Sequence, residues 1–188
     1  MPRTVLFLQG AGRGVHDDWD AKLVASLERA LGPDFRLRYP RMPGEEDPSY
    51  RRWSPVIRLE LAGLRDGDVL VGHSAGGTVL VHTLAEHPPG FRPGALVLIA
   101  APFVGPGGWE LEEMPVRAGF ALPEAMPVSL WHGEADAEVP PDHARLYARA
   151  LPQAALHLVP GADHQLGEDL SGVAAWILGL DWRHAGAS

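Results

Sequence analysis

The sequence predicts an α/β fold in which one mostly parallel sheet of about six strands is covered by helices on both faces. Short apolar runs alternate with segments of helical spacing, a rhythm that favours parallel strands joined by right-handed crossovers. Residues 95–99 are apolar throughout, which is typical of a strand buried on both faces. The chain has 188 residues and neither repeat nor linker, so we expect residues 1–188 to be one domain.

The first two strand-helix units lie at the N-terminal end of the sequence. Residues 4–8 form a β-rich apolar run that ends in a glycine loop, which predicts a buried strand. Apolar residues recur at helical spacing over residues 19–31, and a Gly-Pro step ends that helix. Residues 35–39 are the second expected strand. A loop rich in Pro, Gly and Glu separates it from a helix at about 51–64.

The later units repeat this rhythm. Residues 68–71 are the third expected strand and meet a Gly-rich turn, and residues 78–86 are apolar enough for a buried helix that a Pro-Pro pair ends. After residues 95–99, strands are expected at 128–131 and 155–159, and helices at about 141–151 and 170–180. Ligands of such sheets bind beyond the carboxyl ends of the strands, so the loops after the strands are where a site is expected.

Composition excludes several classes of function. A net charge of -8 argues against a nucleic-acid partner, because such proteins gather Lys and Arg on one face. The sequence has no cysteine, which excludes disulfides, thiolate metal sites and cysteine nucleophiles and suits a cytoplasmic location. The first apolar run is too short for a signal peptide, and no run reaches the roughly 18 residues of a membrane span. We therefore expect no membrane partner.

The sharpest motif is a G-x-S-x-G at residues 72–76, placed directly after a strand and before a helix. On that tight turn the hydroxyl of Ser74 would point out of the sheet, which predicts a nucleophile. The helix N-terminus leaves the N–H of Ala75 free to stabilise an oxyanion. The alternatives are a serine that only caps the helix and a phosphate loop, although the lysine of a phosphate loop is absent.

A serine nucleophile needs a histidine base oriented by a carboxylate. The expected chain order is serine, then acid, then histidine, and Asp136 and His164 follow Ser74 in that order, each in a loop after a strand. We predict His164 as the general base and Asp136 as the acid. Two nearby glutamates, Glu134 and Glu138, compete for the acid's role.

Two further histidines lie close to these residues in the sequence. His73 precedes the nucleophile and is expected to point away from it, and His132 is expected to be structural. In the first loop, the small residues after Gln9 would let the backbone approach a ligand, and the N–H of Ala11 is the predicted second oxyanion donor. A tight turn without a catalytic part is the alternative.

Residues 103–127 break the alternation of strands and helices. This segment could form a small lid or the wall of an acyl pocket. Phe103 and Trp109 are the predicted substrate-binding residues, with Met114 and Phe120 also available to line the wall. Ordinary core or surface packing of these side chains is the alternative.

With these motifs in place, the chain resembles the α/β-hydrolase superfamily, and within it the small, largely capless serine hydrolases of the retinoblastoma-binding-protein type. The resemblance extends over nearly the whole chain, from the first glycine loop to the segment ending at His164. It departs from the superfamily at Gln9-Gly10, where His-Gly is frequent. The resemblance implies hydrolysis of small carboxylic esters, or less often amides or thioesters, without a metal or organic cofactor.

Two other functions fit the same sequence. One is a non-catalytic protein-binding scaffold, because a fold alone does not establish an activity. The other is a different enzyme with the same triad, such as an acyltransferase, a dienelactone-type or carbon-carbon hydrolase, or a perhydrolase. Neither the natural substrate nor the oligomeric state follows from the sequence.

Overall fold

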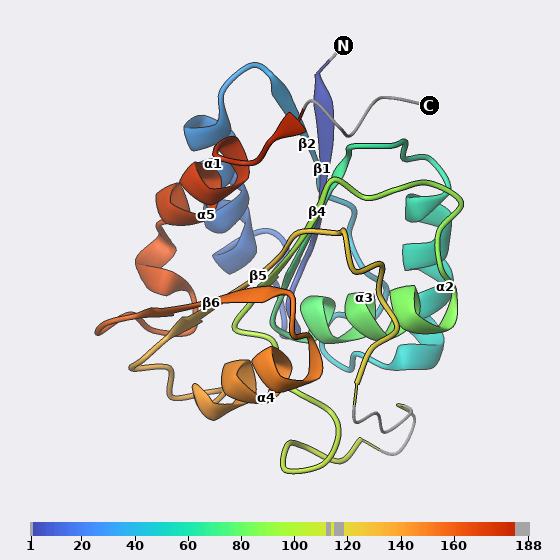
Figure 1. Cartoon of the computed structure of the whole chain (residues 1–188). Helices are drawn as coiled ribbons and strands as arrows, with labels where there is room; N and C mark the ends of the chain where they lie inside the picture. Colours follow the sequence, from blue (N-terminus) through green and yellow to red (C-terminus); the bar gives the residue numbers. More distant parts are fainter. Residues whose placement is uncertain (1, 112–113, 115–118, 183–188) are drawn as a thin grey trace.

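A parallel six-stranded sheet forms the centre of the computed structural model, which describes residues 2–111, 114 and 119–182 (Figure 1). Neighbouring strands pair in parallel throughout, in the order β2-β1-β3-β4-β5-β6. The predicted fold class is therefore confirmed. The strands are β1 (Arg3–Leu8), β2 (Phe35–Arg38), β3 (Val69–His73), β4 (Ala95–Ile99), β5 (Val128–Gly133) and β6 (Ala154–Val159).

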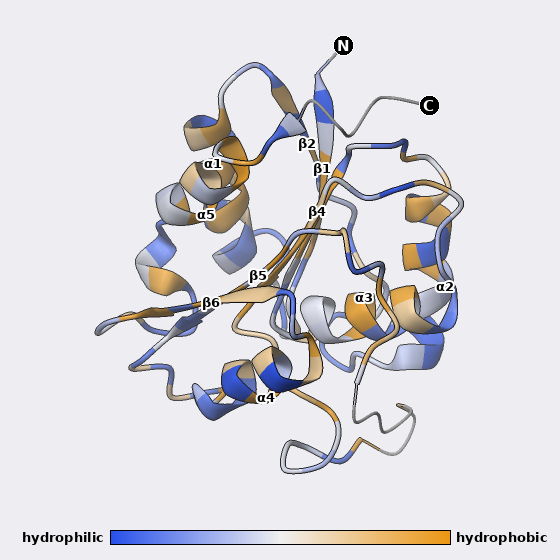
Figure 2. Cartoon of the chain, in the orientation of Figure 1, coloured by the Kyte–Doolittle hydropathy of each residue, from blue (hydrophilic) through white to orange (hydrophobic). Residues whose placement is uncertain are grey.

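Helices cover both faces of the sheet, as predicted. One face carries α1 (Trp19–Leu31) and α5 (Ser171–Leu178), and the other carries α2 (Tyr50–Leu61), α3 (Ser74–Glu86) and α4 (Asp142–Ala150) (Figure 1). Apolar side chains fill two separate core layers, one on each side of the strands, and the sheet and the inward helix surfaces are correspondingly apolar (Figure 2). Among the described helices, none has the length and apolar character needed to cross a membrane.

The largest difference from the expected boundaries lies at α3. The helix begins at Ser74, four residues before the expected start at residue 78, and β3 continues to His73. Glycine has a low helix propensity, so the glycines of this turn led to a predicted helix start at residue 78. In the structure, close packing between strand and helix favours glycine at these positions. A Cβ added to Gly72 would lie 2.4 Å from the Cα of Gly77, so strand and helix meet backbone to backbone.

A second close approach at this turn gives a stability prediction. A Cβ on Gly76 would lie 2.3 Å from the carbonyl oxygen of Gln9, so Gly76→Ala must push α3 away from the end of β1. We expect a loss of about 1–3 kcal/mol in the free energy of unfolding, measured by urea denaturation. Gly90→Ala is the control, because its added Cβ would meet nothing within 4 Å. Equal stability of the two variants would contradict this packing.

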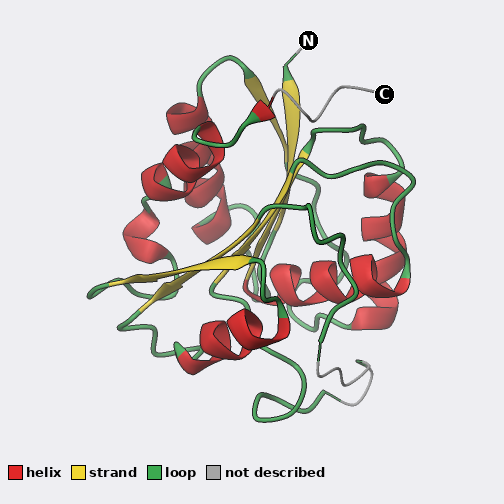
Figure 3. Ribbon diagram, in the orientation of Figure 1, coloured by secondary structure: helices red, strands yellow, loops and turns green. Residues whose placement is uncertain are grey.

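Between β4 and β5 the described residues contain no helix or named strand, only a bridge between Val104 and Trp109 (Figure 3). The predicted lid over residues 103–127 falls partly on residues 112–113 and 115–118, which lie outside the described part of the chain. A single 3-10 turn, η1 (Leu166–Glu168), follows β6 and leads into α5.

Candidate active site

The predicted catalytic loops meet at one point of the sheet. From β1 the strand order proceeds to β2 on one side and to β3 on the other, so its direction changes between β1 and β3. At such a switch point the two loops diverge and leave a crevice beyond the carboxyl ends of the strands. The loop after β1 holds Ala11 and the turn after β3 holds Ser74, so the topology places both at this crevice.

Ser74 has the backbone geometry of a strained turn. Its φ is +50°, in the left-handed region that non-glycine residues seldom adopt, and such strain typically costs about 1–3 kcal/mol. The serine is half-buried and is the first residue of α3, so the N–H of Ala75 belongs to the first helical turn and has no partner within the helix. This turn presents a hydroxyl and a backbone donor at the same point.

His164 and Asp136 form a buried hydrogen-bonded pair. The Nδ1 of His164 lies 2.8 Å from Oδ2 of Asp136, and both residues are less than a tenth exposed. Since an ionised carboxylate only accepts hydrogen bonds, Nδ1 carries the proton and Nε2 keeps its lone pair. His164 and Ser74 line the same two cavities, so the unprotonated nitrogen belongs to the same site as the serine.

The surroundings of Asp136 keep it ionised. Burial alone would raise the pKa of this carboxyl, but hydrogen bonds from His132, His164 and the N–H of Val139 outweigh burial and hold the pKa well below its ordinary value. Its Oδ1 accepts the N–H of Glu138 and of Val139, each at 2.9 Å. The tautomer of His164 is therefore fixed by a charge that persists at neutral pH.

The two glutamates that compete with Asp136 for the role of the acid lie in other positions. Glu134 is exposed and follows β5, and Glu138 lies with its Oε2 3.9 Å from Nε2 of His164, on the opposite side of the ring from Asp136. The Glu138 side chain is 68% exposed, so solvent screens its charge. His132 is buried and its Nε2 lies 2.8 Å from the carbonyl oxygen of Val139 and 3.1 Å from Oδ2 of Asp136. His132 thus supports the acid loop.

Two carboxylates hold the first loop in place. Asp20 accepts the N–H of Gly10 at 2.6 Å, and Glu45 accepts the N–H of Gly14 at 2.9 Å and of His16 at 3.4 Å. The carbonyl oxygen of Glu45 also accepts the N–H of Gly12 at 2.7 Å. In the described part of the chain the N–H of Ala11, between these fixed amides, donates to no protein group, and Ala11 lines both cavities beside Ser74.

Gln9 occupies the position at which the superfamily often has histidine, and its contacts hold the first loop in place without one. Its side chain is fully buried, donates from Nε2 to Glu45 at 2.9 Å and accepts the N–H of Met42 at 2.8 Å. It therefore ties the end of β1 to the loop after β2. Neither Glu45 nor Asp20 was predicted from the sequence to belong to the site. An acid in a loop rich in Pro and Gly, and an acid in the first turn of a helix, both resemble ordinary surface residues.

Two cavities adjoin Ser74. One, of about 350 Å³, is mainly apolar and is lined by Tyr50, Val79, Trp109, Leu111 and Met114. The other, of about 360 Å³, is bounded by the first loop and by Arg13, Trp19 and Gln165. Both are of the size that small-molecule ligands occupy.

The predicted substrate-binding pair is separated by the structure. Trp109 lines the apolar cavity and is 40% exposed. Phe103 is only 2% exposed and packs edge-on against Phe120 and Tyr147, away from the lining of both cavities. The prediction for Phe103 is corrected: its ring completes the core under α4, and Leu111 and Met114 line the cavity instead.

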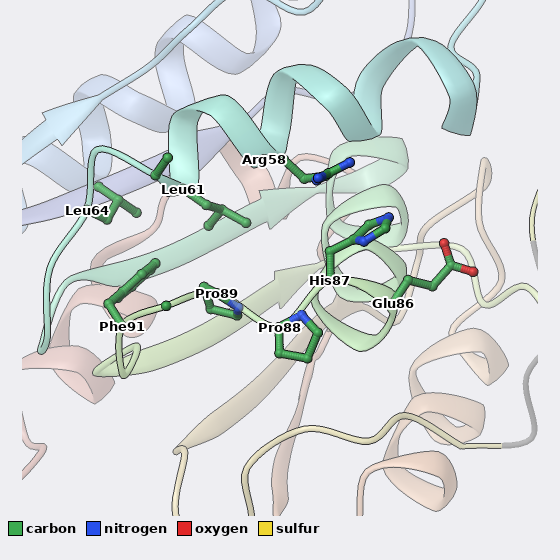
Figure 4. A pocket seen from close by; sticks show the side chains of 10 residues that line it. Arg58, Leu61, Leu64, Glu86, His87, Pro88, Pro89 and Phe91 are labelled. Atoms are coloured by element: carbon green, nitrogen blue, oxygen red, sulfur yellow. The ribbon is translucent and has the colours of Figure 1, made fainter.

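A larger cavity, of about 660 Å³, lies elsewhere. It opens at the amino-end edge of the sheet, between α2 and the segment that joins α3 to β4, and its walls include Arg58, Leu61, His87 and Phe91 (Figure 4). No serine lies in its lining. Among the described residues, no group of three His, Cys, Asp or Glu side chains is placed to hold a metal ion.

Comparison with known proteins assigns the class. A sequence model described as the alpha/beta hydrolase family matches residues 5–180, which is most of the chain. The chain therefore belongs to the alpha/beta hydrolase family. A search of curated proteins gave no match.

Solved structures share the fold. The ydeN gene product of B. subtilis is 19% identical, with a TM-score of 0.74 over 94% of this chain and 97% of that one. A putative YdeN-like hydrolase of Pectobacterium atrosepticum is 20% identical, with a TM-score of 0.65 over 93% and 92% of the two chains. The monoacylglycerol lipase of Paleococcus ferrophilus is 18% identical, with a TM-score of 0.67 over 95% of each chain. At these identities the likeness shows the fold alone.

Proposed function

We propose that this hydrolase is a serine esterase that cleaves small carboxylic esters through Ser74, His164 and Asp136. The observation that supports this most strongly is the 2.8 Å contact between Asp136 and Nδ1 of His164, since it leaves Nε2 as a base in the cavities that Ser74 lines. Amides and thioesters are possible substrates of the same groups. Within the family, the small size and the motif order support a resemblance to the retinoblastoma-binding-protein type.

The proposed reaction has two acyl-transfer steps. In the first, Oγ of Ser74 attacks the ester carbonyl while Nε2 of His164 takes its proton, and the tetrahedral intermediate expels the alcohol, which receives that proton. In the second, His164 deprotonates a water that attacks the acyl-enzyme, and Ser74 leaves reprotonated. The N–H groups of Ala11 and Ala75 stabilise the negative oxygen in both steps, and Asp136 stabilises the imidazolium. No cofactor is needed.

The two cavities suggest how an ester would lie across Ser74. The apolar cavity suits a hydrocarbon acyl group, because each methylene removed from water there contributes about 0.8 kcal/mol. The second cavity, with Arg13, Gln165 and backbone amides in its lining, suits the more polar alcohol. This orientation supports small substrates with an apolar acid part and a polar leaving group.

A chain-length series tests the assignment of the acyl cavity. We expect kcat/KM on p-nitrophenyl esters to fall once the acyl chain outgrows the apolar cavity, and Met114→Ala, which enlarges that cavity, to shift the optimum to longer chains. Met126→Ala is the control, because Met126 is equally buried in the same core layer but does not line the cavity. An unchanged optimum in Met114→Ala, or the same shift in both variants, would contradict the assignment.

A broad ester panel tests the function itself. Turnover of at least one neutral ester, absent in Ser74→Ala, is the expected result. Adding acceptor alcohols or peroxide during turnover separates hydrolysis from acyl transfer or perhydrolysis, since only the last two give new products. Absence of turnover on the whole panel would favour a scaffold. A cytoplasmic location and small-molecule esters as the partners are further proposals, supported by the sequence.

A further inference from the structure

Asp20 and His73 form a buried pair that the proposed reaction steps do not use. Asp20 comes from the first turn of α1 and is 0% exposed, and His73 is the last residue of β3 and is 1% exposed. Oδ1 of Asp20 and Nδ1 of His73 lie 2.9 Å apart in ion-pair contact. The contact is not aligned as a hydrogen bond, and within the described residues neither atom has a hydrogen-bond partner. The two buried atoms therefore interact through their 2.9 Å approach, without an aligned hydrogen bond.

The pair also reaches all three segments of the site. Oδ2 of Asp20 accepts the N–H of Gly10 at 2.6 Å, one residue before the oxyanion donor Ala11. Nε2 of His73 lies 3.2 Å from the carbonyl oxygen of His164, and His73 itself directly precedes Ser74. A buried series of polar contacts thus runs from Gly10 through Asp20 and His73 to His164.

Chemistry fixes how protons are placed along this chain. The carbonyl oxygen of His164 only accepts, so Nε2 of His73 carries a proton. A second proton on Nδ1 of His73 would lie beside Oδ1 of Asp20, 2.9 Å away. Burial lowers the pKa of His73, but the nearby carboxylate of Asp20 outweighs burial and raises it above its ordinary value. The site therefore favours the charged form of a buried histidine, an arrangement that packing alone would not require.

We propose that Asp20 and His73 are positioning residues that hold the oxyanion loop, the nucleophile turn and the base in register. This inference rests on the proposed hydrolase function, because it concerns the alignment of that site. Neither residue touches the substrate. Their effect is exerted through the backbone of Gly10 and His164, so it should fall on the rate of the chemical step.

The first test compares two replacements of Asp20. Asp20→Ala removes both contacts, and we expect kcat to fall about 100-fold, the size of effect that a 1 Å misplacement can have, with little change in KM. In Asp20→Asn the amide oxygen can still accept the N–H of Gly10, and the amide nitrogen can donate to a neutral His73 that keeps its Nε2 proton. We therefore expect kcat of Asp20→Asn to stay within about tenfold of wild type.

Asp68→Ala is the matched control. Asp68 is likewise buried and accepts a backbone N–H, that of Thr4 at 2.8 Å. It precedes β3, however, and therefore lies at the opposite end of that strand from Ser74. Its loss should lower stability and leave kcat of the folded enzyme unchanged. If Asp20→Ala and Asp68→Ala have the same kcat, or if Asp20→Asn loses as much as Asp20→Ala, the proposal is wrong.

A double variant covers the case in which Asp20→Ala does not fold. Asp20→Leu with His73→Leu removes both charges together, which leaves no buried ion without its partner. We expect it to fold and to show the same loss in kcat, and full activity would overturn the proposal. Fluorophosphonate labelling of wild-type Ser74 tests the hydrolase function separately. If the wild type is labelled and the double variant is fully active, only the positioning role is refuted. If the wild type is not labelled, the proposed hydrolase function is refuted.

Discussion

Ser74→Ala is expected to lower kcat on any substrate ester by about 10⁴-fold or more. In the proposed reaction this variant lacks the oxygen that forms the acyl-enzyme. Because Cβ and the backbone stay in place, binding should persist, and KM should change little. The measurement is steady-state kinetics with an ester that the wild type turns over well.

Ser171→Ala is the control for this experiment, since Ser171 is exposed at the start of α5 and does not line the cavities beside Ser74. Its kinetics should match those of the wild type. The unfolding free energy of Ser74→Ala should stay close to that of the wild type, because alanine keeps the Cβ that causes the strain at φ +50°. Retention of wild-type turnover by Ser74→Ala would exclude Ser74 as the nucleophile.

Asp136→Asn is expected to lower kcat by about 10⁴-fold while the protein remains folded. An amide facing His164 can donate to Nδ1, which would move the ring proton to Nε2 and remove the base. Asp163→Asn is the control, because Asp163 is an exposed acid directly beside His164 whose side-chain oxygen accepts the N–H of Gln165 and of Gly167, bonds that an amide oxygen preserves. Equal kcat of the two variants would remove Asp136 from the triad.

The same substitution has a pH signature in stability. The pKa of Asp136 is lower in the folded protein than its ordinary value, so its ionisation stabilises the fold above the unfolded-state pKa of about 3.9. That contribution is lost as the pH falls through the folded-state pKa. The wild type should therefore exceed Asp136→Asn in unfolding free energy at pH 7, and the difference should shrink below about pH 4. Urea titrations at several pH values measure it, and a difference independent of pH would contradict the shift.

The sequence was sufficient to predict the fold and to propose candidate residues for the site. Alternation of apolar runs with helical spacing predicted the parallel sheet, and it is confirmed. Ser74, Asp136 and His164 could be predicted as candidates because each follows a strand, where side chains of distant segments converge, and their catalytic roles stay a prediction. The local signals at these turns are strong and do not depend on what packs against them.

The remaining features depend on contacts between distant segments. Nothing near Asp20 in the sequence indicates that it meets Gly10 and His73, and Glu45 is one acid among several in its loop. Phe103 was predicted to line the pocket, because an aromatic residue after a strand fits a pocket wall as well as a core. Its packing against α4 places it in the core. The early start of α3 likewise depends on close backbone packing between strand and helix, which helix propensity does not describe.

The most direct test of the central claim is covalent labelling of the nucleophile. Wild-type protein and Ser74→Ala are incubated with a fluorophosphonate probe, and the intact mass of each is measured. We predict one added phosphonyl group on the wild type and none on the variant, because only a serine activated by His164 reacts. Labelling of neither protein, or equal labelling of both, would contradict the assignment of Ser74 as an activated nucleophile.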